Sequence, residues 1–324
     1  MPRLAVPVFA LALIAAPLAV GGQTPGNVPR VGIIHFSGEW RTMIDGLRQG
    51  LRELGLEESK HFVLDIRETS YDLKAVEAAA KDLERGRVDL IYSVSTSATL
   101  AVKKATTRTP IVFYAGFDPV AAGLVESLAR PGGRLTGVLG RTTDLTAKRM
   151  QILKEIVPRL HRAMILHDPD NPLSRENLRL AHEAAQKLGV QLVERPVRSV
   201  KELRSALAAL KPRDADAFFQ IADAMVTGQT QLIIDAALAN KWPTMFYEYS
   251  LVLKGGLAGY GQNYQEIGRL SAKHVQRVLA GIQPKDLPVE NYDKIELALN
   301  LRTAREIGLT IPPAVRIRAD KLIE

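Results

Sequence analysis

The sequence of 324 residues contains no cysteine. This absence excludes disulfide bonds, thiolate metal sites, a cysteine nucleophile and lipid attachment to an N-terminal cysteine. Aromatic residues are scarce as well, because the chain has only 2 Trp, 8 Tyr and 8 Phe. The positions of these few rings are therefore informative about where a pocket lies.

Charge clusters and long apolar runs are also missing beyond the first twenty residues. Lys and Arg number 43 against 35 Asp and Glu, a net charge of +8, but the basic residues form no run of five or more. A dispersed excess is typical of a solvated surface, so we expect no nucleic-acid partner. No later segment is apolar for long enough to span a bilayer.

Motifs that carry catalysis are absent too. The chain has no G-x-S-x-G, no P-loop and no H-E-x-x-H, and Gly259–Tyr264 lacks the third glycine of a dinucleotide-binding fingerprint. The six histidines show no metal-ligand spacing. We therefore expect no catalytic residues, no cofactor and no metal.

The N-terminus has the pattern of an export signal. Arg3 precedes the uncharged segment Leu4–Val20, which small residues follow. We expect residues 1–22 to be a signal peptide that is cleaved near Gly21 or Gly22, and a periplasmic mature protein. The alternative is an uncleaved anchor, but two prolines interrupt the segment and its length falls short of a comfortable span.

Strand and helix patterns alternate along the rest of the chain in two successive runs. This alternation predicts an α/β protein with two Rossmann-like lobes, whose parallel sheets are joined by a hinge. We expect lobe I to comprise residues 28–140 plus about 262–290, and lobe II residues 141–261 plus about 291–324. Within the first run, Val120–Leu128 is predicted to be helical.

Ligands of parallel α/β sheets bind beyond the carboxyl ends of the strands. The residues that end or follow the predicted strands are therefore the candidate ligand-binding residues. They are Phe36, Ser37, Ser95, Thr96, Ser97, Tyr114, Gly116, Asp118, Arg141 and Thr142 in the first run, and Asp168, Asn171, Asp223, Tyr247, Glu248 and Tyr260 in the second.

Among these candidates, Ser95–Ser97 open a helix directly after a buried strand, where free backbone N–H groups and the helix dipole favour an anion. Simple helix capping explains the same residues. Asp223 and Glu248 are suited to binding an amine, whereas Asp118 and Asp168 each precede a proline and have a turn role as the alternative.

The aromatic residues gather at the same strand ends, which favours a pocket lined with rings over simple covering of the sheet ends. We expect about half of these rings to contact a ligand. The residues concerned are Phe36, Trp40, Tyr114, Phe117, Tyr247, Tyr249, Tyr260 and Tyr264.

Several segments resemble one known family. Asp118–Gly137, with the sequence DPVAAGLVESLARPGGRLTG, resembles a hallmark segment of the ABC transporter substrate-binding proteins with the type I periplasmic-binding-protein fold. The segments Ser95–Ala98, Thr109–Phe113, Lys148–Pro158, Asp168–Pro172 and Glu296–Leu309 are similar to that family as well. The resemblance runs from about Val31 to Glu324.

This resemblance implies a hinged receptor that closes on a small molecule and presents it to an ABC permease, with membrane contact only through that permease. Some members bind aromatic or branched amino acids. Ser95–Ser97 would then hold a carboxylate, and Asp223 or Glu248 would face an amine. Arg141 stands where related chains often carry an apolar or aromatic residue, which leaves room for a more acidic ligand.

Two other classes of function remain as alternatives. A two-lobe α/β enzyme acting on a small metabolite, exported or cytoplasmic, would need an acid or base in the cleft, such as His167 or Glu248. A ligand-sensing DNA-binding regulator would need a helix-turn-helix before Val31, where the sequence has only the signal-like segment.

Overall fold

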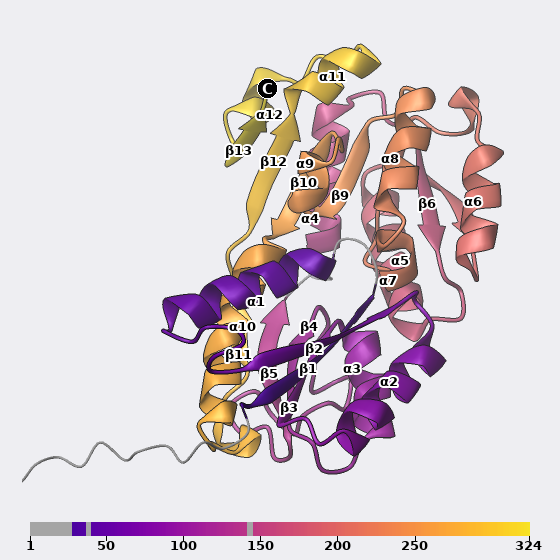
Figure 1. The fold of residues 1–324 in the computed structure, drawn as a ribbon. Coiled ribbons are helices and arrows are strands. Elements are labelled where there is room, and N and C mark those ends of the chain that lie inside the picture. The colour runs from indigo at the N-terminus through magenta and orange to yellow at the C-terminus, as the bar shows by residue number, and fades with distance from the viewer. Residues whose placement is uncertain (1–27, 37–39, 141–144) are drawn as a thin grey trace, which may run out of the picture.

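The computed structural model describes residues 28–36, 40–140 and 145–324, and two β-sheets form their framework (Figure 1). The predicted signal peptide lies outside the described residues, as do Ser37, Arg141 and Thr142. Within the described part of the chain, no helix combines the length and the apolar character needed to cross a membrane.

The first sheet has six strands, all paired in parallel, in the order β11-β5-β4-β3-β1-β2. Helices pack against both of its faces (Figure 1). The strands are β1 (Arg30–Phe36), β2 (Val63–Thr69), β3 (Leu90–Val94), β4 (Ile111–Ala115), β5 (Leu135–Gly140) and β11 (Glu290–Tyr292). The helices are α1 (Arg41–Glu53), α2 (Leu73–Arg85), α3 (Thr96–Ala105), α10 (Tyr264–Leu279) and the 3₁₀ turn Pro284–Asp286.

The second sheet has seven strands in the order β13-β12-β10-β9-β8-β6-β7, and only the pair β10–β12 is antiparallel. The strands are β6 (Arg162–His167), β7 (Gln191–Pro196), β8 (Ala217–Phe219), β9 (Thr244–Glu248), β10 (Ala258–Gln262), β12 (Glu296–Asn300) and β13 (Lys321–Ile323). The helices are α4 (Thr146–Ile156), α5 (Pro172–Lys187), α6 (Val200–Ala208), α7 (Ala224–Thr227), α8 (Thr230–Ala239), α9 (Ser250–Leu253), α11 (Leu301–Ile307), α12 (Pro313–Arg316) and the 3₁₀ turn Pro212–Asp214.

Burial follows from this layering. Strands β3, β4 and β5 are buried at every residue, as expected for parallel strands with helices on both faces. In β6, Ala163 and Ile165 belong to one apolar cluster, whereas Met164 and Leu166 belong to another. Because side chains alternate along a strand, these two clusters lie on opposite faces of the second sheet. The predicted fold class, two α/β lobes with mostly parallel sheets, is confirmed.

The chain crosses between the two sheets three times. It passes from β5 to α4, returns from β10 to α10, and passes again from β11 to β12. The second crossing brings α10 back onto the first lobe, where it packs along α1 (Figure 1). Three connections therefore join the two lobes, and residues 141–144 of the first connection lie outside the described residues.

The expected helix over Val120–Leu128 is wrong. The segment forms consecutive turns instead, with Leu124 N donating to Pro119 O at 2.8 Å and Ala122 N to Asp118 O at 2.9 Å. Gly123 has a φ of +70°, which a right-handed helix does not accommodate. The apolar spacing of the segment suggested a helix, but this backbone reversal ends the helical path after one turn.

Candidate ligand-binding site

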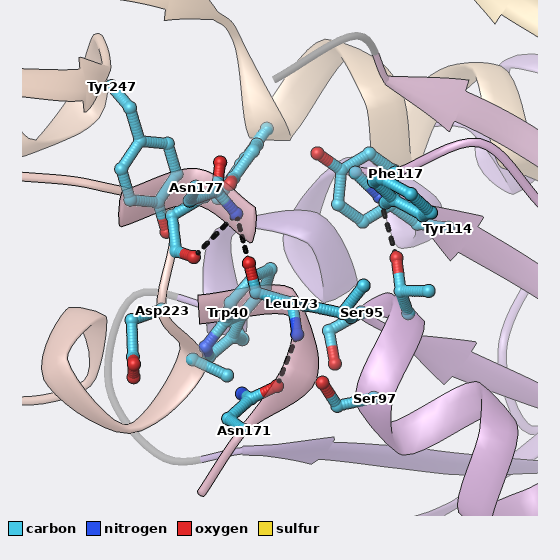
Figure 2. A pocket seen from close by; sticks show the side chains of 15 residues that line it. Trp40, Ser95, Ser97, Tyr114, Phe117, Asn171, Leu173, Asn177, Asp223 and Tyr247 are labelled. Atoms are coloured by element: carbon cyan, nitrogen blue, oxygen red, sulfur yellow. Dashed lines mark hydrogen bonds between the residues drawn. The ribbon is translucent and has the colours of Figure 1, made fainter. Parts of the chain in front are cut away.

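A pocket lies between the two lobes, and its empty volume of about 470 Å³ includes space that is open to solvent. Its lining side chains, most of which Figure 2 labels, come from strands, loops and helices of both lobes. The described lining residues are Trp40, Ser95, Thr96, Ser97, Tyr114, Gly116, Phe117, Asn171, Leu173, Asn177, Ala222, Asp223, Ala224, Tyr247 and Tyr264.

The start of helix α3 forms the polar wall of the first lobe. Ser95 adopts φ +96° and ψ +151°, a conformation rare for a residue with a side chain, and its Oγ accepts from Ala98 N at 3.2 Å. Thr96 Oγ1 accepts from Gly116 N at 3.1 Å and so joins this turn to the loop after β4. The first-turn N–H groups of α3 have no partner within the helix, and the positive end of its dipole faces the same way. This wall is suited to a carboxylate.

Asp223 forms the acidic wall of the second lobe. It follows β8 and caps α7, with its carboxylate accepting from Val226 N at 3.1 Å and from Asp168 N at 2.8 Å. Asp223 is 2% exposed, and no ion pair to it occurs among the described residues. Each carboxylate oxygen can accept more than one hydrogen bond, so this anion retains capacity for a cationic group of a ligand.

Two asparagines shape the floor beside Asp223. Asn171 caps α5, with its Oδ1 accepting from Leu173 N at 3.0 Å. Asn177 lies further along the same helix, and its Nδ2 donates to Leu173 O at 2.8 Å and to Ala222 O at 3.1 Å (Figure 2). The bond to Ala222 O connects α5 to the loop that carries Asp223, so these two segments of the second lobe have a fixed relative position.

Aromatic rings close the remaining sides, and Tyr264 lies at the centre of them. Its ring stacks on Trp40 at 5.3 Å, meets Tyr114 edge-on at 5.6 Å and lies 6.4 Å from Tyr247. Burial raises the pKa of Tyr247 and Tyr264 above the usual value, so both phenols remain neutral hydrogen-bonding groups at physiological pH. Such a box suits a flat, unsaturated ligand group.

Trp40 adds an unused donor to this box. Its side chain is 4% exposed, and its Nε1 has no hydrogen-bond partner among the described residues. Leaving a buried donor unpaired costs free energy, and that cost disappears when a ligand supplies an acceptor. The indole N–H is therefore a further point at which the pocket can recognise a polar ligand atom.

A buried cation stands behind the aromatic box. Arg149 on α4 is 1% exposed, its Nε donates to Tyr260 O at 2.7 Å, and its guanidinium lies 5.8 Å from the centre of the Tyr247 ring. Burial lowers the pKa of Arg149 to about 10, which leaves it charged at neutral pH. Arg149 thus contacts both strand β10 and the ring of Tyr247, but it is not one of the described residues that line the pocket.

Half of the sixteen predicted residues line this pocket. The structure brings together eight of them, namely Ser95, Thr96, Ser97, Tyr114, Gly116, Asn171, Asp223 and Tyr247. Three others, Ser37, Arg141 and Thr142, lie outside the described residues. The remaining five, Phe36, Asp118, Asp168, Glu248 and Tyr260, occupy other environments.

Two of these five pack with the apolar cores of the lobes, Phe36 as a buried member and Tyr260 as a partly buried neighbour. Phe36 is 1% exposed and stacks on Tyr71 with ring centres 5.0 Å apart, which turns it away from the pocket into the first lobe. Tyr260 packs against an apolar cluster of the second lobe. Both residues lie near the ends of predicted strands. Side chains alternate between the two faces of a sheet, and these two point to the apolar cores and not to the pocket.

Two others have local backbone roles. Asp118 is exposed, and its Oδ1 accepts from Val120 N at 2.8 Å and from Ala121 N at 3.3 Å, which organises the turns after β4. Asp168 Oδ1 accepts from Asp170 N at 2.9 Å, and partial burial raises the pKa of its carboxyl. These are the turn roles that the following prolines had suggested as the alternative.

Glu248, the last of the five, is absent from the described pocket lining, and its side chain accepts hydrogen bonds from the start of the following helix. It is fully buried, and its carboxylate accepts from Ser250 N at 2.9 Å, Ser250 Oγ at 2.5 Å and Leu251 N at 3.2 Å. These bonds organise the start of α9 on the side of β9 away from the pocket lining.

Replacing Glu248 with glutamine is expected to lower the free energy of unfolding by about 2 kcal/mol, because an amide group cannot accept all three bonds. Ligand affinity should stay within about twofold of wild type, since the residue lies outside the pocket. Urea unfolding and calorimetric titration measure the two effects. A loss of affinity that exceeds the loss of stability would return Glu248 to the binding site.

Four pocket residues have no predicted site role, namely Leu173, Asn177, Ala222 and Ala224. Trp40, Phe117 and Tyr264 also line the pocket, and all three belong to the predicted aromatic cluster. Five of the eight clustered rings line the pocket, and these are Trp40, Tyr114, Phe117, Tyr247 and Tyr264. Asn177 carried one usable signal, a polar residue on the buried face of an amphipathic helix.

Comparison with known proteins agrees with this architecture. The family model described as "ABC transporter substrate binding protein" matches residues 33–323. The tyrosine-binding protein of Clostridioides difficile is 26% identical over 266 residues, which cover 82% of this chain and 76% of that protein.

Two solved structures have the same fold. A conserved domain protein of Vibrio cholerae gives a TM-score of 0.81 at 27% identity, covering 91% of this chain and 100% of that one. The ABC domain of Streptococcus pneumoniae in complex with L-Trp gives 0.80 at 24% identity, covering 92% and 100%. With the family model matched over most of its length, the chain belongs to the ABC transporter substrate-binding proteins.

Proposed function

We propose that the protein binds a free amino acid with an aromatic side chain in the cleft between its lobes and delivers it to an ABC importer. The observation that carries this proposal is the combination, within one pocket, of a helix start suited to a carboxylate, a buried acid that has no cation partner among the described residues, and a box of aromatic rings. An α-amino acid presents the matching carboxylate, ammonium group and ring.

The roles follow from the chemistry of each wall. The α-carboxylate lies against the first turn of α3 at Ser95–Ser97, where N–H groups and the helix dipole stabilise it. The ammonium group donates to Asp223, and the side chain stacks within the box around Tyr264. Closure of the two lobes excludes water and strengthens both charged contacts.

The relatives support this ligand class. One is named a tyrosine-binding protein, and a structure of the same fold was solved with L-Trp. Arg141 suggests a more acidic ligand, but it lies outside the described residues and therefore does not support that ligand class.

The enzyme alternative has less support. The two residues suggested as its acid or base, His167 and Glu248, are not among the described residues that line the pocket.

Export and delivery are the wider parts of the proposal. The family assignment, together with the charge pattern of residues 1–22, supports a mature protein in the periplasm that contacts the membrane through a permease. We propose no cofactor and no metal as part of its activity.

Ligand analogues test the assignment of the walls. Addition of L-tyrosine or L-tryptophan is expected to raise the melting temperature of the protein in a thermal-shift assay. A ligand that binds only the folded state stabilises that state by mass action. The methyl ester of each ligand lacks the carboxylate, and the matching arylpropionic acid lacks the amine. We expect each analogue to lose at least about tenfold in affinity, the value of one charge-assisted hydrogen bond. An ester that binds as tightly as its parent would contradict the carboxylate contact at Ser95–Ser97. An arylpropionic acid that binds as tightly as its parent would contradict the amine contact at Asp223.

A further inference from the structure

Tyr71 belongs to the first lobe but packs against the second. It lies between β2 and α2, and it contacts both the apolar core of its own lobe and the second-lobe cluster that contains Met225 and Val226. It also lines a surface groove together with Met225 and Gln229. These contacts lie between the two lobes and outside the ligand pocket.

The first lobe holds this side chain in a fixed position. Tyr71 has a φ of +61°, which is unfavourable for a bulky residue, and its N donates to Thr69 O at 2.8 Å. Its ring stacks on the buried Phe36 with an interplanar angle of 24°. Unfavourable backbone conformations of this kind persist where the surroundings determine them and are concentrated at functional positions.

The second lobe has a matching seat at Gly228, directly after α7. A Cβ atom built on Gly228 would lie 1.4 Å from Tyr71 Oη and 1.7 Å from its Cζ. The phenol therefore occupies the space that any larger residue at position 228 would need. Moving the ring aside would break its stack on Phe36, so a side chain at this position acts against the contact between the lobes.

Helix α7 connects this seat to the ligand pocket. Asp223 caps its start, and Thr227 near its end shares a 2.6 Å hydrogen bond with Tyr247 of the aromatic box. One short helix thus carries the proposed amine-binding group at one end and the seat for Tyr71 at the other. Contact at Gly228 and contact with the ligand both require the same approach of the two lobes.

We propose that Tyr71 is a positioning residue that latches the closed state by seating on Gly228, and that it thereby sets the ligand affinity without touching the ligand. The inference rests on the proposed function. A receptor that binds ligand only when closed has an apparent affinity that scales with its closed population. Contacts that exist only in the closed state therefore tighten binding from outside the pocket.

A double-mutant cycle tests this latch. Gly228→Ala and Tyr71→Ala are each expected to weaken binding of the aromatic amino acid by about tenfold, measured by calorimetric titration. The double variant should be no weaker than Tyr71→Ala alone, because the added methyl group has room once the ring is gone. Tyr71→Phe keeps the ring and its stack on Phe36, and it should bind more tightly than Tyr71→Ala.

Damage to α7 would give a different pattern. If Gly228→Ala acted by distorting Asp223, its loss of affinity would persist in the Tyr71→Ala background, and the latch would be contradicted. Wild-type affinity in either single variant would contradict it as well. The matched control is Gly133→Ala, an exposed first-lobe position where an added Cβ meets nothing within 4 Å, and it should bind as wild type.

Failure of the latch and failure of the proposed function can be told apart. If the wild-type protein binds no aromatic amino acid, the proposed function fails. Small-angle scattering then tests the latch without ligand, and a larger radius of gyration for Gly228→Ala than for wild type supports it. Equal radii would overturn it.

Discussion

Replacing Asp223 with asparagine is expected to weaken binding of an aromatic amino acid by about 10- to 100-fold, the range for one charge-assisted hydrogen bond. The carboxylate is almost fully buried and has no cation partner among the described residues, so an ammonium group of the ligand is its natural counter-ion. Asparagine keeps an oxygen that can cap α7 at Val226 N but loses the charge. Calorimetric titration measures the affinity.

Asp168→Asn is the matched control for this substitution. Asp168 is a neighbouring acid that donates its backbone N–H to Asp223, but its side chain turns to Asp170 N and does not line the pocket. We expect its affinity to change by less than about threefold. Equal losses in the two variants would mean that general negative charge, rather than the Asp223 carboxylate, attracts the ligand.

Replacing Gly46 with alanine is expected to lower the free energy of unfolding of the first lobe by about 3 kcal/mol, the upper end of the usual cost of overpacking. A Cβ at Gly46 would lie 1.9 Å from Gln265 O of α10, and one at Gly268 would lie 2.0 Å from Met43 O of α1. Both oxygens belong to the backbone, so the two helices must separate to admit a methyl group. Urea unfolding followed by circular dichroism measures the change.

The Gly46→Ala substitution also tests whether the position of α10 affects the ligand pocket. Helix α10 begins at Tyr264, which stands at the centre of the aromatic box. Displacement of α10 should therefore weaken ligand binding along with stability. Gly133→Ala serves again as the control, since it adds a methyl group in open space. If Gly46→Ala unfolded at the wild-type urea concentration, the close contact of α1 with α10 would not contribute as described.

The fold was predictable because the periodic patterns are strong. Buried strands such as β3 and β4 appear in the sequence as short apolar runs. Gly55 and Gly189 each follow the end of a helix and have positive φ, a conformation that glycine favours. Strands β11 and β13 were not predicted, because each has only three residues and too few positions to display a period. The turns at Val120–Leu128 were missed because apolar spacing does not report the backbone reversal at Gly123.

The site was predictable to the extent that it follows strand ends. Ser95 and Asp223 line the candidate pocket, as expected for residues that follow parallel strands and converge at one edge. The same rule misled for Glu248, since position along the chain does not say whether a side chain turns to the cleft or to the following helix. Asn177 lies inside a helix, and its role depends on packing between distant segments.

Native mass spectrometry of the mature protein with an equimolar mixture of amino acids tests the central claim most directly. We expect a complex of one protein with one aromatic amino acid, and recovery of that amino acid with unchanged mass when the complex dissociates. A protein that remains unloaded with tyrosine, tryptophan and phenylalanine all present, or one that releases a chemically altered ligand, would contradict it.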